Sequence, residues 1–246
     1  MSQRKECMET TKIVRLYFSG KLGQWELQCL RGAVNKMLHD AGGSYEGNML
    51  FHNHEAGGLR YGYPLVQFRR AGSQAVIVGI GDAADTVHSL AEKHELKLTI
   101  GRRETVLAVE KCEETFYTPT VADEPKLYSL TNYIALTDQN LKDYGDLLAL
   151  SDKIIFLEKI IVGNILSFFK GIGHHTDERL VAVLTAVDRV GETSYKGVKW
   201  KTFCLHFVSN VVLPDGIGLG KSAAVGYGTL MREKLDDKFI KRFTNG

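Results

Sequence analysis

Apolar and polar positions follow two different periods near the start of this chain. Residues 12–19 alternate as a β-strand does and are rich in β-branched and aromatic side chains. Residues 26–38 instead repeat Leu, Ala, Val and Met at helical spacing, and the glycines at 42–43 mark the end of that helix. The pattern therefore predicts a strand followed by a helix.

A second strand–helix pattern follows the first. Residues 63–69 and 74–80 are predicted strands, and residues 82–94 a helix with Asp82 as its N-cap. Residues 97–116 complete the series as two strands or one bent hairpin, divided near residue 110. The order β-α-β-β-α-β is the ferredoxin-like motif.

The second half repeats this order less cleanly. Pro119 and Pro125 mark residues 118–125 as a linker. Beyond it we predict a strand at 127–136, a helix at 151–169, strands at 179–190 and 199–213, and a short strand at 227–231. We therefore expect an α+β fold of two tandem ferredoxin-like (βαββαβ) domains, at residues 8–118 and 126–235, with a C-terminal glycine-rich loop and a charged tail at 236–246.

Composition narrows the function classes only slightly. The chain has 246 residues, 44% of them hydrophobic, and a formal net charge of +2, which allows a nucleic-acid partner without requiring one. Its four cysteines form no C-x-x-C pair, which argues against a zinc ribbon and favours a cytoplasmic location. The N-terminus carries no signal-peptide pattern, and the longest apolar run, residues 160–169, is too short to span a bilayer.

Residues 214–229, PDGIGLGKSAAVGYGT, hold five glycines, a lysine and a serine between two strand patterns. Glycines let a backbone approach another molecule, and successive free N–H groups can bind an anion, so we expect a phosphate-contacting loop. The sequence GKS at 220–222 resembles the end of a nucleotide-triphosphate P-loop. However, Asp215 replaces that motif's first glycine, and Gly226 and Gly228 disfavour the helix it requires. A glycine-rich turn between strands is the plainer alternative.

Two histidines, His52 and His54, stand two residues apart in a segment without a clean period. Imidazole has an unperturbed pKa near 6.5 and exchanges protons at neutral pH, so the pair suits general acid–base catalysis. The same pair would suit a metal site if Glu55 or His39 supplied a third ligand. Two surface histidines in a polar loop are the remaining interpretation.

Basic and aromatic residues follow the histidine pair. Arg60, Tyr61, Arg69 and Arg70 are interleaved in a pattern typical of proteins that stack on unpaired bases and contact phosphates. A strand with one solvated basic face would show the same pattern. We treat these four residues as candidate RNA contacts.

Together these features resemble the CRISPR-associated endoribonucleases of the RAMP superfamily, which cut precursor CRISPR RNA within its repeats. Residues 216–228 match that family's signature loop, G-φ-G-φ-G-x5-G-φ-G, and residues 51–54 and 60–68 are similar to the subgroup with paired N-terminal histidines. The resemblance runs from about residue 11 to residue 231. It implies that the loop contacts RNA through Gly216, Gly218, Gly220, Ser222, Gly226 and Gly228, and that it positions an RNA strand between the two domains.

The resemblance also implies a cleavage that needs no metal or other cofactor. The ribose 2′-hydroxyl attacks the adjacent phosphate and leaves a 2′,3′-cyclic phosphate and a 5′-hydroxyl. His52 and His54 would be the acid and the base, in an order that the sequence leaves open. Lys221 ranks ahead of Lys170 and Lys201 for stabilising the phosphorane charge.

Several alternatives stay open. Family members differ in where the active histidine lies, so His39 is a rival to His52 and His54. The protein could instead be a non-catalytic RNA-binding subunit of a CRISPR ribonucleoprotein, or a metal-dependent hydrolase that uses the paired histidines. The expected partner is CRISPR repeat RNA, with no membrane. A homodimer or an association with other subunits of a CRISPR effector complex is compatible with the sequence.

Overall fold

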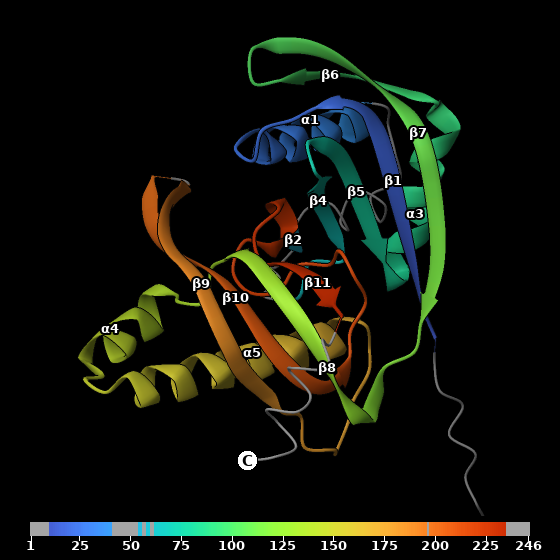
Figure 1. The fold of residues 1–246 in the computed structure, drawn as a ribbon. Coiled ribbons are helices and arrows are strands. Elements are labelled where there is room, and N and C mark those ends of the chain that lie inside the picture. The colour runs from blue at the N-terminus through green and yellow to red at the C-terminus, as the bar shows by residue number, and fades with distance from the viewer. Residues whose placement is uncertain (1–9, 41–53, 56–57, 60–61, 196, 235–246) are drawn as a thin grey trace, which may run out of the picture. The chain divides into compact units, whose positions relative to one another are not determined.

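The computed structural model describes residues 10–40, 54–55, 58–59, 62–195 and 197–234 (Figure 1). The chain divides into two compact units, each built on its own β-sheet. Unit 1 comprises Met1–Pro119, Ser167–His175 and Ala224–Gly226, and unit 2 comprises Thr120–Leu166, Thr176–Ala223 and Tyr227–Gly246. Two short pieces from the C-terminal half of the sequence therefore belong to unit 1.

Unit 1 contains an antiparallel sheet with the strand order β4-β5-β1-β7-β6. The strands are β1 (Thr11–Lys21), β4 (Val66–Ala71), β5 (Gln74–Ile80), β6 (Glu95–Ile100) and β7 (Arg103–Tyr117). Helix α1 (Glu26–Asp40) follows β1, and helix α3 (Ala84–Ser89) follows β5. Once β6 is set aside as an added edge strand, this order confirms the ferredoxin-like arrangement. A separate pair, β2 (His54–Glu55) and β3 (Gly58–Leu59), lies between α1 and β4 in sequence.

Helix α1 packs through the apolar stripe that the sequence predicts. Leu27, Leu30 and Val34 recur at helical spacing and are all fully buried. Each such side chain contributes about 1.5–3 kcal/mol through burial. Ahead of the helix, the Gly23 N–H donates to Glu26 Oε2 over 2.7 Å, which satisfies a backbone donor near the helix terminus.

The turn from β5 into α3 requires glycine at two positions. Gly81 has a φ of +55°, and a Cβ on Gly79 would lie 2.6 Å from the Ala83 carbonyl oxygen. Packing therefore explains the G-x-G pattern at this turn. The predicted N-cap at Asp82 is wrong, because a 3-10 turn, Gly81–Ala83, comes first and no side chain caps α3.

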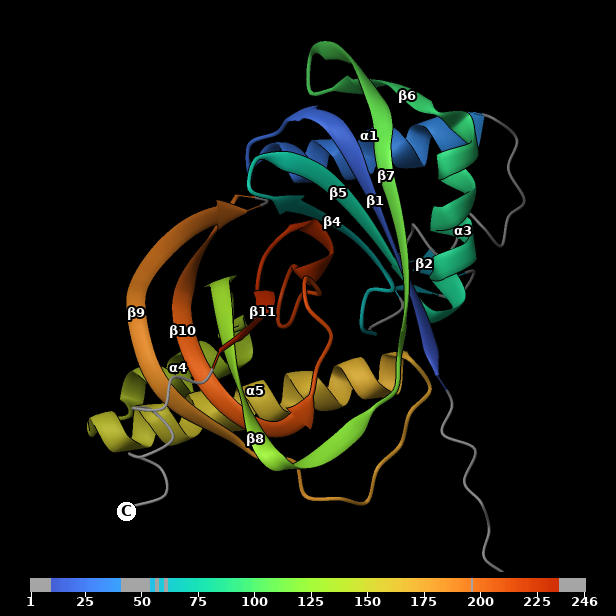
Figure 2. The same ribbon diagram turned by 45° about the vertical axis from the view of Figure 1, so that its right-hand side comes forward.

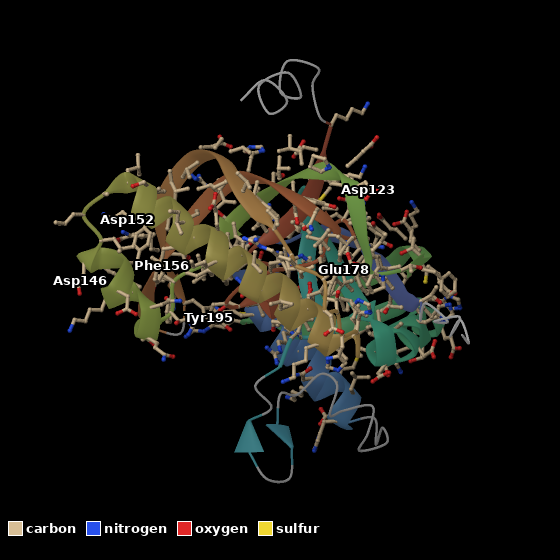
Figure 3. The ribbon with its side chains drawn as sticks, turned by 90° about the horizontal axis from the view of Figure 1, so that it is seen from below. Asp123, Asp146, Asp152, Phe156, Glu178 and Tyr195 are labelled. Carbon is tan, nitrogen blue, oxygen red and sulfur yellow. The ribbon has the colours of Figure 1, made fainter. Side chains whose placement is uncertain are left out.

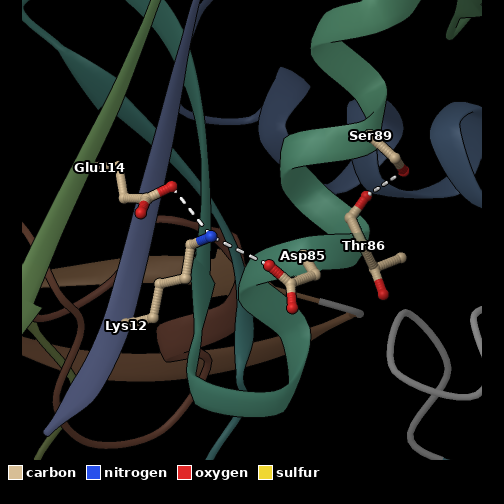
Figure 4. A network of polar contacts seen from close by, with 5 residues as sticks. All are labelled: Lys12, Asp85, Thr86, Ser89 and Glu114. Atoms are coloured by element: carbon tan, nitrogen blue, oxygen red, sulfur yellow. Dashed lines mark hydrogen bonds and ion pairs between the residues drawn. The ribbon is translucent and has the colours of Figure 1, made fainter.

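A polar network joins β1, α3 and β7 (Figure 4). Lys12 Nζ lies 2.9 Å from Glu114 Oε2 and 3.0 Å from Asp85 Oδ1. Hydrogen bonds to Glu114 and then to Asp85 raise the pKa of Lys12. On α3 itself, the Ser89 hydroxyl donates to the Thr86 carbonyl over 2.9 Å. The network links the helix to the sheet at a partly exposed position.

The last two strands of unit 1 turn earlier than the sequence suggests. Ile100 pairs with Arg103, and Gly101 between them has a φ of +66°. Strand β7 then runs unbroken to Tyr117, because β1 pairs with it from Thr11 to Phe18. The predicted division near residue 110 is therefore wrong, since the partner strand, rather than local pattern, keeps β7 continuous.

Unit 2 contains an antiparallel sheet with the strand order β11-β8-β10-β9. The strands are β8 (Thr120–Tyr133), β9 (Ala182–Tyr195), β10 (Val198–Val212) and β11 (Thr229–Glu233). This is again the ferredoxin-like order, but the glycine-rich loop replaces the second helix. The register between β9 and β10 shifts twice, and both strands are strongly curved (Figure 2). Such irregularities bend a strand locally.

Helices α4 (Asp138–Asp146) and α5 (Leu150–Gly171) lie between β8 and β9 in sequence. Thr137 and Asn140 form a capping box at the start of α4, a helix absent from the elements predicted above. Figure 3 shows Asp146 and Asp152 where α4 leads into α5, and Phe156 further along α5 packs its ring 6.0 Å from that of Tyr144. No helix in the described part of the chain is long and apolar enough to cross a membrane.

The linker predicted at residues 118–125 is wrong in its extent. Strand β8 already begins at Thr120 and runs through Pro125. Its pairing with β10 shifts in this stretch, since Val121 pairs with Val211 but Lys126 with Ser209. Proline has no N–H to donate, so an irregular stretch of a strand accommodates it.

Candidate nucleic-acid interface

Of the paired histidines, His52 precedes a short hairpin of unit 1 and His54 belongs to it. His54 opens β2, and its backbone pairs with Leu59 of β3. The side chain of His54 and the whole of His52, Arg60 and Tyr61 lie outside the described residues. Their assignments therefore remain predictions.

The chain that leaves the histidine segment is anchored by an aromatic contact. The ring of Tyr63 packs edge-on against Phe168 at a centroid distance of 5.1 Å, and Gln67 Nε2 donates to the Tyr63 hydroxyl over 2.9 Å. A Cβ on Gly171 would lie 2.7 Å from the Tyr63 Cβ, so glycine permits this close approach. Burial raises the pKa of Tyr63. The end of α5 thus fixes the start of the strand that follows the histidines.

Lys170 lies beside this anchor, in the last turn of α5, and is exposed. It belongs to unit 1, as do Tyr63 and the histidine segment. Just beyond it, the His174 ring packs edge-on against Phe169 at 4.8 Å. The sequence ranked Lys170 below Lys221, and the role of either lysine stays a prediction.

Arg69 and Arg70 have opposite environments. Arg69 is only 2% exposed and donates to Gln67 Oε1 over 3.1 Å. Burial lowers its pKa to about 10. The prediction that Arg69 contacts RNA finds no support in this structure, because the protein encloses its guanidinium. Arg70 is half-buried, donates to the Gly72 carbonyl over 3.0 Å, and remains a candidate phosphate contact.

His39 lies in the last turn of α1 and is exposed. Its Nδ1 is 3.5 Å from Asp40 Oδ1, and 80% of its side-chain surface is accessible. The position is typical of a cationic group near a helix C-terminus. The helix-terminal position alone explains a histidine here, and the catalytic role of His39 stays a prediction.

Several backbone donors of the glycine-rich loop are used inside the protein. The Gly216 N–H donates to the Leu230 carbonyl over 2.8 Å, and the Leu219 N–H donates to the Gly228 carbonyl over 2.9 Å. The Gly228 N–H donates to Asn132, and Asn132 itself adopts a left-handed φ of +49°. Free, successive N–H groups were expected here, and these amides do not supply them.

Packing explains three of the five loop glycines. A Cβ on Gly220 would lie 2.5 Å from Tyr133 Cε2, one on Gly226 would overlap Leu27, and one on Gly228 would overlap the Leu219 carbonyl oxygen. All three residues also have positive φ. These glycines permit close protein packing without any RNA strand, which the sequence could not distinguish from close approach of a ligand.

The part of the loop suited to an anion is short. Lys221 and Ser222 are half-buried, and Ser222 has a φ of +60°, unusual for serine. The Lys221 N–H donates to the Ile134 carbonyl over 3.1 Å, and its Nζ lies 4.0 Å from the Trp200 ring centroid. A 3-10 turn, Ala223–Val225, follows instead of an α-helix. This geometry argues against the nucleotide-triphosphate P-loop.

The third lysine candidate, Lys201, lies near an aromatic ring, and the described residues do not support the metal-site alternative. Lys201 Nζ lies 5.8 Å from the Tyr144 ring centroid, and Lys153 Nζ lies 5.6 Å from the same centroid. Among the described residues no group of three His, Cys, Asp or Glu side chains could hold a metal ion. The proposed ligands His52, His54 and Glu55 have side chains outside that set.

Sequence reasoning missed Trp200, whose only signal was a tryptophan within a strand pattern.

Two family models together match almost the entire chain. The model of the Cas6b N-terminal domain matches residues 9–117, and the model of the Cas6b C-terminal domain matches residues 120–233. The chain belongs to the Cas6b family. The resemblance drawn from the histidines and the glycine loop is therefore confirmed at the level of the family.

Solved Cas6b structures share this fold. A crystal structure of Cas6b is 22% identical, covers 92% of this chain and all of its own, and has a TM-score of 0.79. A crystal structure of a CRISPR RNA processing endoribonuclease, Cas6b, is 21% identical over the same shares with a TM-score of 0.68. An uncharacterized protein of Methanocaldococcus jannaschii is 34% identical over 103 residues, which are 42% of this chain and 69% of that protein.

Proposed function

We propose that this Cas6b-family protein is an endoribonuclease that cleaves precursor CRISPR RNA within its repeats. The observation that carries the proposal is the match of Cas6b domain models to both halves of the chain, with a similar fold in a crystal structure named as a CRISPR RNA processing endoribonuclease. We place its action in the cytoplasm, as the scattered cysteines suggest. Its partner is the repeat RNA.

The proposed chemistry needs two proton transfers and one charge stabiliser. A base removes the proton of the ribose 2′-hydroxyl, whose oxygen attacks the adjacent phosphorus, and an acid protonates the departing 5′-oxygen. The products are a 2′,3′-cyclic phosphate and a 5′-hydroxyl. We assign the two proton transfers to His52 and His54, and we retain His39 as the rival. The negative charge that develops on the phosphorane calls for a cation, which Lys221 or Lys170 would supply.

Outside the glycine-rich loop, a residue can contact an RNA phosphate only if its side chain is accessible. Arg70 is accessible and remains proposed as a backbone contact, together with Arg60 and Tyr61. Within the loop, we now limit the direct contact to Gly220, Lys221 and Ser222. Gly216, Gly218, Gly226 and Gly228 stay in the proposal only as the scaffold that holds this short segment.

The decisive experiment uses a panel of repeat RNAs and, for each, an analogue with one 2′-deoxy nucleotide just upstream of the cut. We expect the natural RNA to be cleaved in excess EDTA and the analogue to bind but stay intact. Cleavage of the analogue would refute attack by the 2′-hydroxyl. Loss of cleavage in EDTA would favour the metal-dependent hydrolase, and binding without any cleavage would favour the non-catalytic subunit.

Single substitutions then locate the acid and the base. His52→Ala and His54→Ala should each lower the single-turnover rate by about 10²–10⁴-fold at unchanged RNA affinity, the usual contribution of a general acid or base. The pH–rate profile of the natural protein should be bell-shaped. His39→Ala is the matched control and should cleave normally. If it loses cleavage while the other two variants keep theirs, our assignment is wrong.

A further inference from the structure

The Lys221 ammonium rests on an aromatic ring of the same unit. Its Nζ is 4.0 Å from the centroid of Trp200, well within the range of a cation–π contact, and tryptophan is the strongest partner for such a contact. The Lys221 N–H is held by the Ile134 carbonyl. Both the backbone and the charged end of this lysine are therefore fixed.

Trp200 is itself held rigidly on β10. It is 6% exposed and pairs with Thr193 of β9. The Thr193 hydroxyl lies 3.0 Å from the Tyr227 hydroxyl, and the Tyr227 ring packs against Tyr195 at 5.9 Å. The ring beneath Lys221 thus belongs to a packed cluster from β9, β10 and the end of the glycine-rich loop.

Packing alone does not favour tryptophan at this position. The Trp200 indole N–H is buried and has no hydrogen-bond partner among the described residues. A buried donor without a partner destabilises the fold, and phenylalanine or leucine would avoid that cost. Tryptophan does offer the best face for a cation, so the contact with Lys221 explains the residue better than core packing does.

The charge of Lys221 has no counter-ion among the described residues. Within the described part of the chain, no carboxylate lies at ion-pair distance from its ammonium. A lysine that is oriented but unneutralised can present its charge to an anion. The aromatic face also displaces water from one side of the ammonium, which strengthens its interaction with a phosphate.

We propose that Trp200 is a positioning residue that holds the Lys221 ammonium ready for a phosphate of the bound RNA. The inference rests on the proposed function and extends it to a residue outside the loop. A flexible lysine loses rotamer freedom when it binds an anion, and Trp200 removes much of that loss in advance. The contribution should be visible in the rate and not only in stability.

Fluorescence tests the contact without any need for cleavage. Trp25 is 66% exposed, and Trp25→Phe leaves Trp200 as the sole tryptophan. In this background Lys221→Met should change the Trp200 emission, whereas Lys221→Arg should change it much less. The 2′-deoxy repeat RNA should alter the emission of the W25F protein and not that of W25F/K221M. An equal response in both, or an emission that ignores Lys221→Met, would overturn the proposal.

Cleavage of repeat RNA at saturating concentration tests the functional role. Trp200→Leu should slow the single-turnover rate about tenfold, and Trp200→Phe about threefold, as expected for a partly desolvated cation–π contact. Trp200→Leu in the K221M protein should cause no further loss, because the two residues act as one unit. Multiplied effects of W200L and K221M would show independent roles and refute the inference. Melting curves identify any variant that is unfolded.

The fluorescence and cleavage measurements together distinguish failure of the proposed function from failure of the role assigned to Trp200. If the protein cleaves no repeat RNA, the proposed function fails, while the RNA-dependent emission change still decides whether Trp200 and Lys221 act together. If cleavage occurs but W200F and W200L are equally slow, the aromatic face is irrelevant, and Trp200 has no positioning role.

Discussion

Gly228→Ala separates a glycine kept for folding from one kept for RNA. Gly228 has a φ of +59° and its N–H donates to the Asn132 carbonyl. A Cβ at this position would overlap the Leu219 carbonyl oxygen and lie 3.0 Å from its carbon and 3.3 Å from its nitrogen. These neighbours are backbone atoms and cannot rotate away, so the loop itself must shift.

Three terms set the expected loss of stability. Alanine in a left-handed conformation costs about 1 kcal/mol relative to glycine. Relief of the overlap by a backbone shift costs about 1–3 kcal/mol, as overpacking does elsewhere. The shift also weakens the hydrogen bond from the Leu219 N–H to the Gly228 carbonyl, which contributes about 0.5–1.5 kcal/mol. We therefore expect a loss of about 3–5 kcal/mol.

Gly197→Ala is the matched control. Gly197 also lies in unit 2 and has a φ of +76°, but a Cβ there meets no described atom within 4 Å. It should lose only the conformational term of about 1 kcal/mol. Urea unfolding in the W25F background, followed by Trp200 emission, reports on unit 2. If Gly228→Ala is as stable as Gly197→Ala but fails to bind RNA, the glycine serves the ligand and our reasoning is wrong.

Two further predictions concern unit 1. Arg69→Ala should destabilise it by about 2–4 kcal/mol, because it opens a cavity and removes the hydrogen bond to Gln67 Oε1, whereas Arg70→Ala should change stability by less than about 0.5 kcal/mol and weaken RNA binding. Urea unfolding and RNA titration at several salt concentrations distinguish the two, and weaker binding by folded Arg69→Ala would contradict the assignment. Hydrogen bonds from Lys111 and then Tyr17 hold the pKa of Glu113 below its ordinary value of 4.5. Its contribution to stability is therefore present above pH 4.5 and lost as the pH falls through the lower folded value. Glu113→Gln should flatten this acid limb by less than about 1 kcal/mol, because the pair is largely exposed, and an unchanged slope below pH 4.5 would contradict the assignment.

Much of the fold was predictable because its signals are local. The apolar spacing of Leu27, Leu30 and Val34 defines α1 without reference to any other element. The same holds for α5 and for the alternation of β1. Where the prediction was wrong, pairing with a strand distant in sequence determined the extent of the strand. Strand β1 keeps β7 continuous past residue 110, and β10 extends β8 through Pro125.

The candidate site, like the fold, was predictable from the sequence only where its signals are local. Residue types and spacing were enough to identify the family, since glycines at fixed intervals and a histidine pair are properties of the chain itself. The burial of Arg69, the packing of Gly220, Gly226 and Gly228, and the contact between Lys221 and Trp200 depend on which segments the fold brings together. Arg69 and Arg70 are neighbours of one chemical type, and only the sheet decides that one is enclosed and the other half-buried. The sequence determined which groups are available, and the tertiary structure decided which of them can reach a ligand, because exposure and close contact depend on residues far apart in the chain.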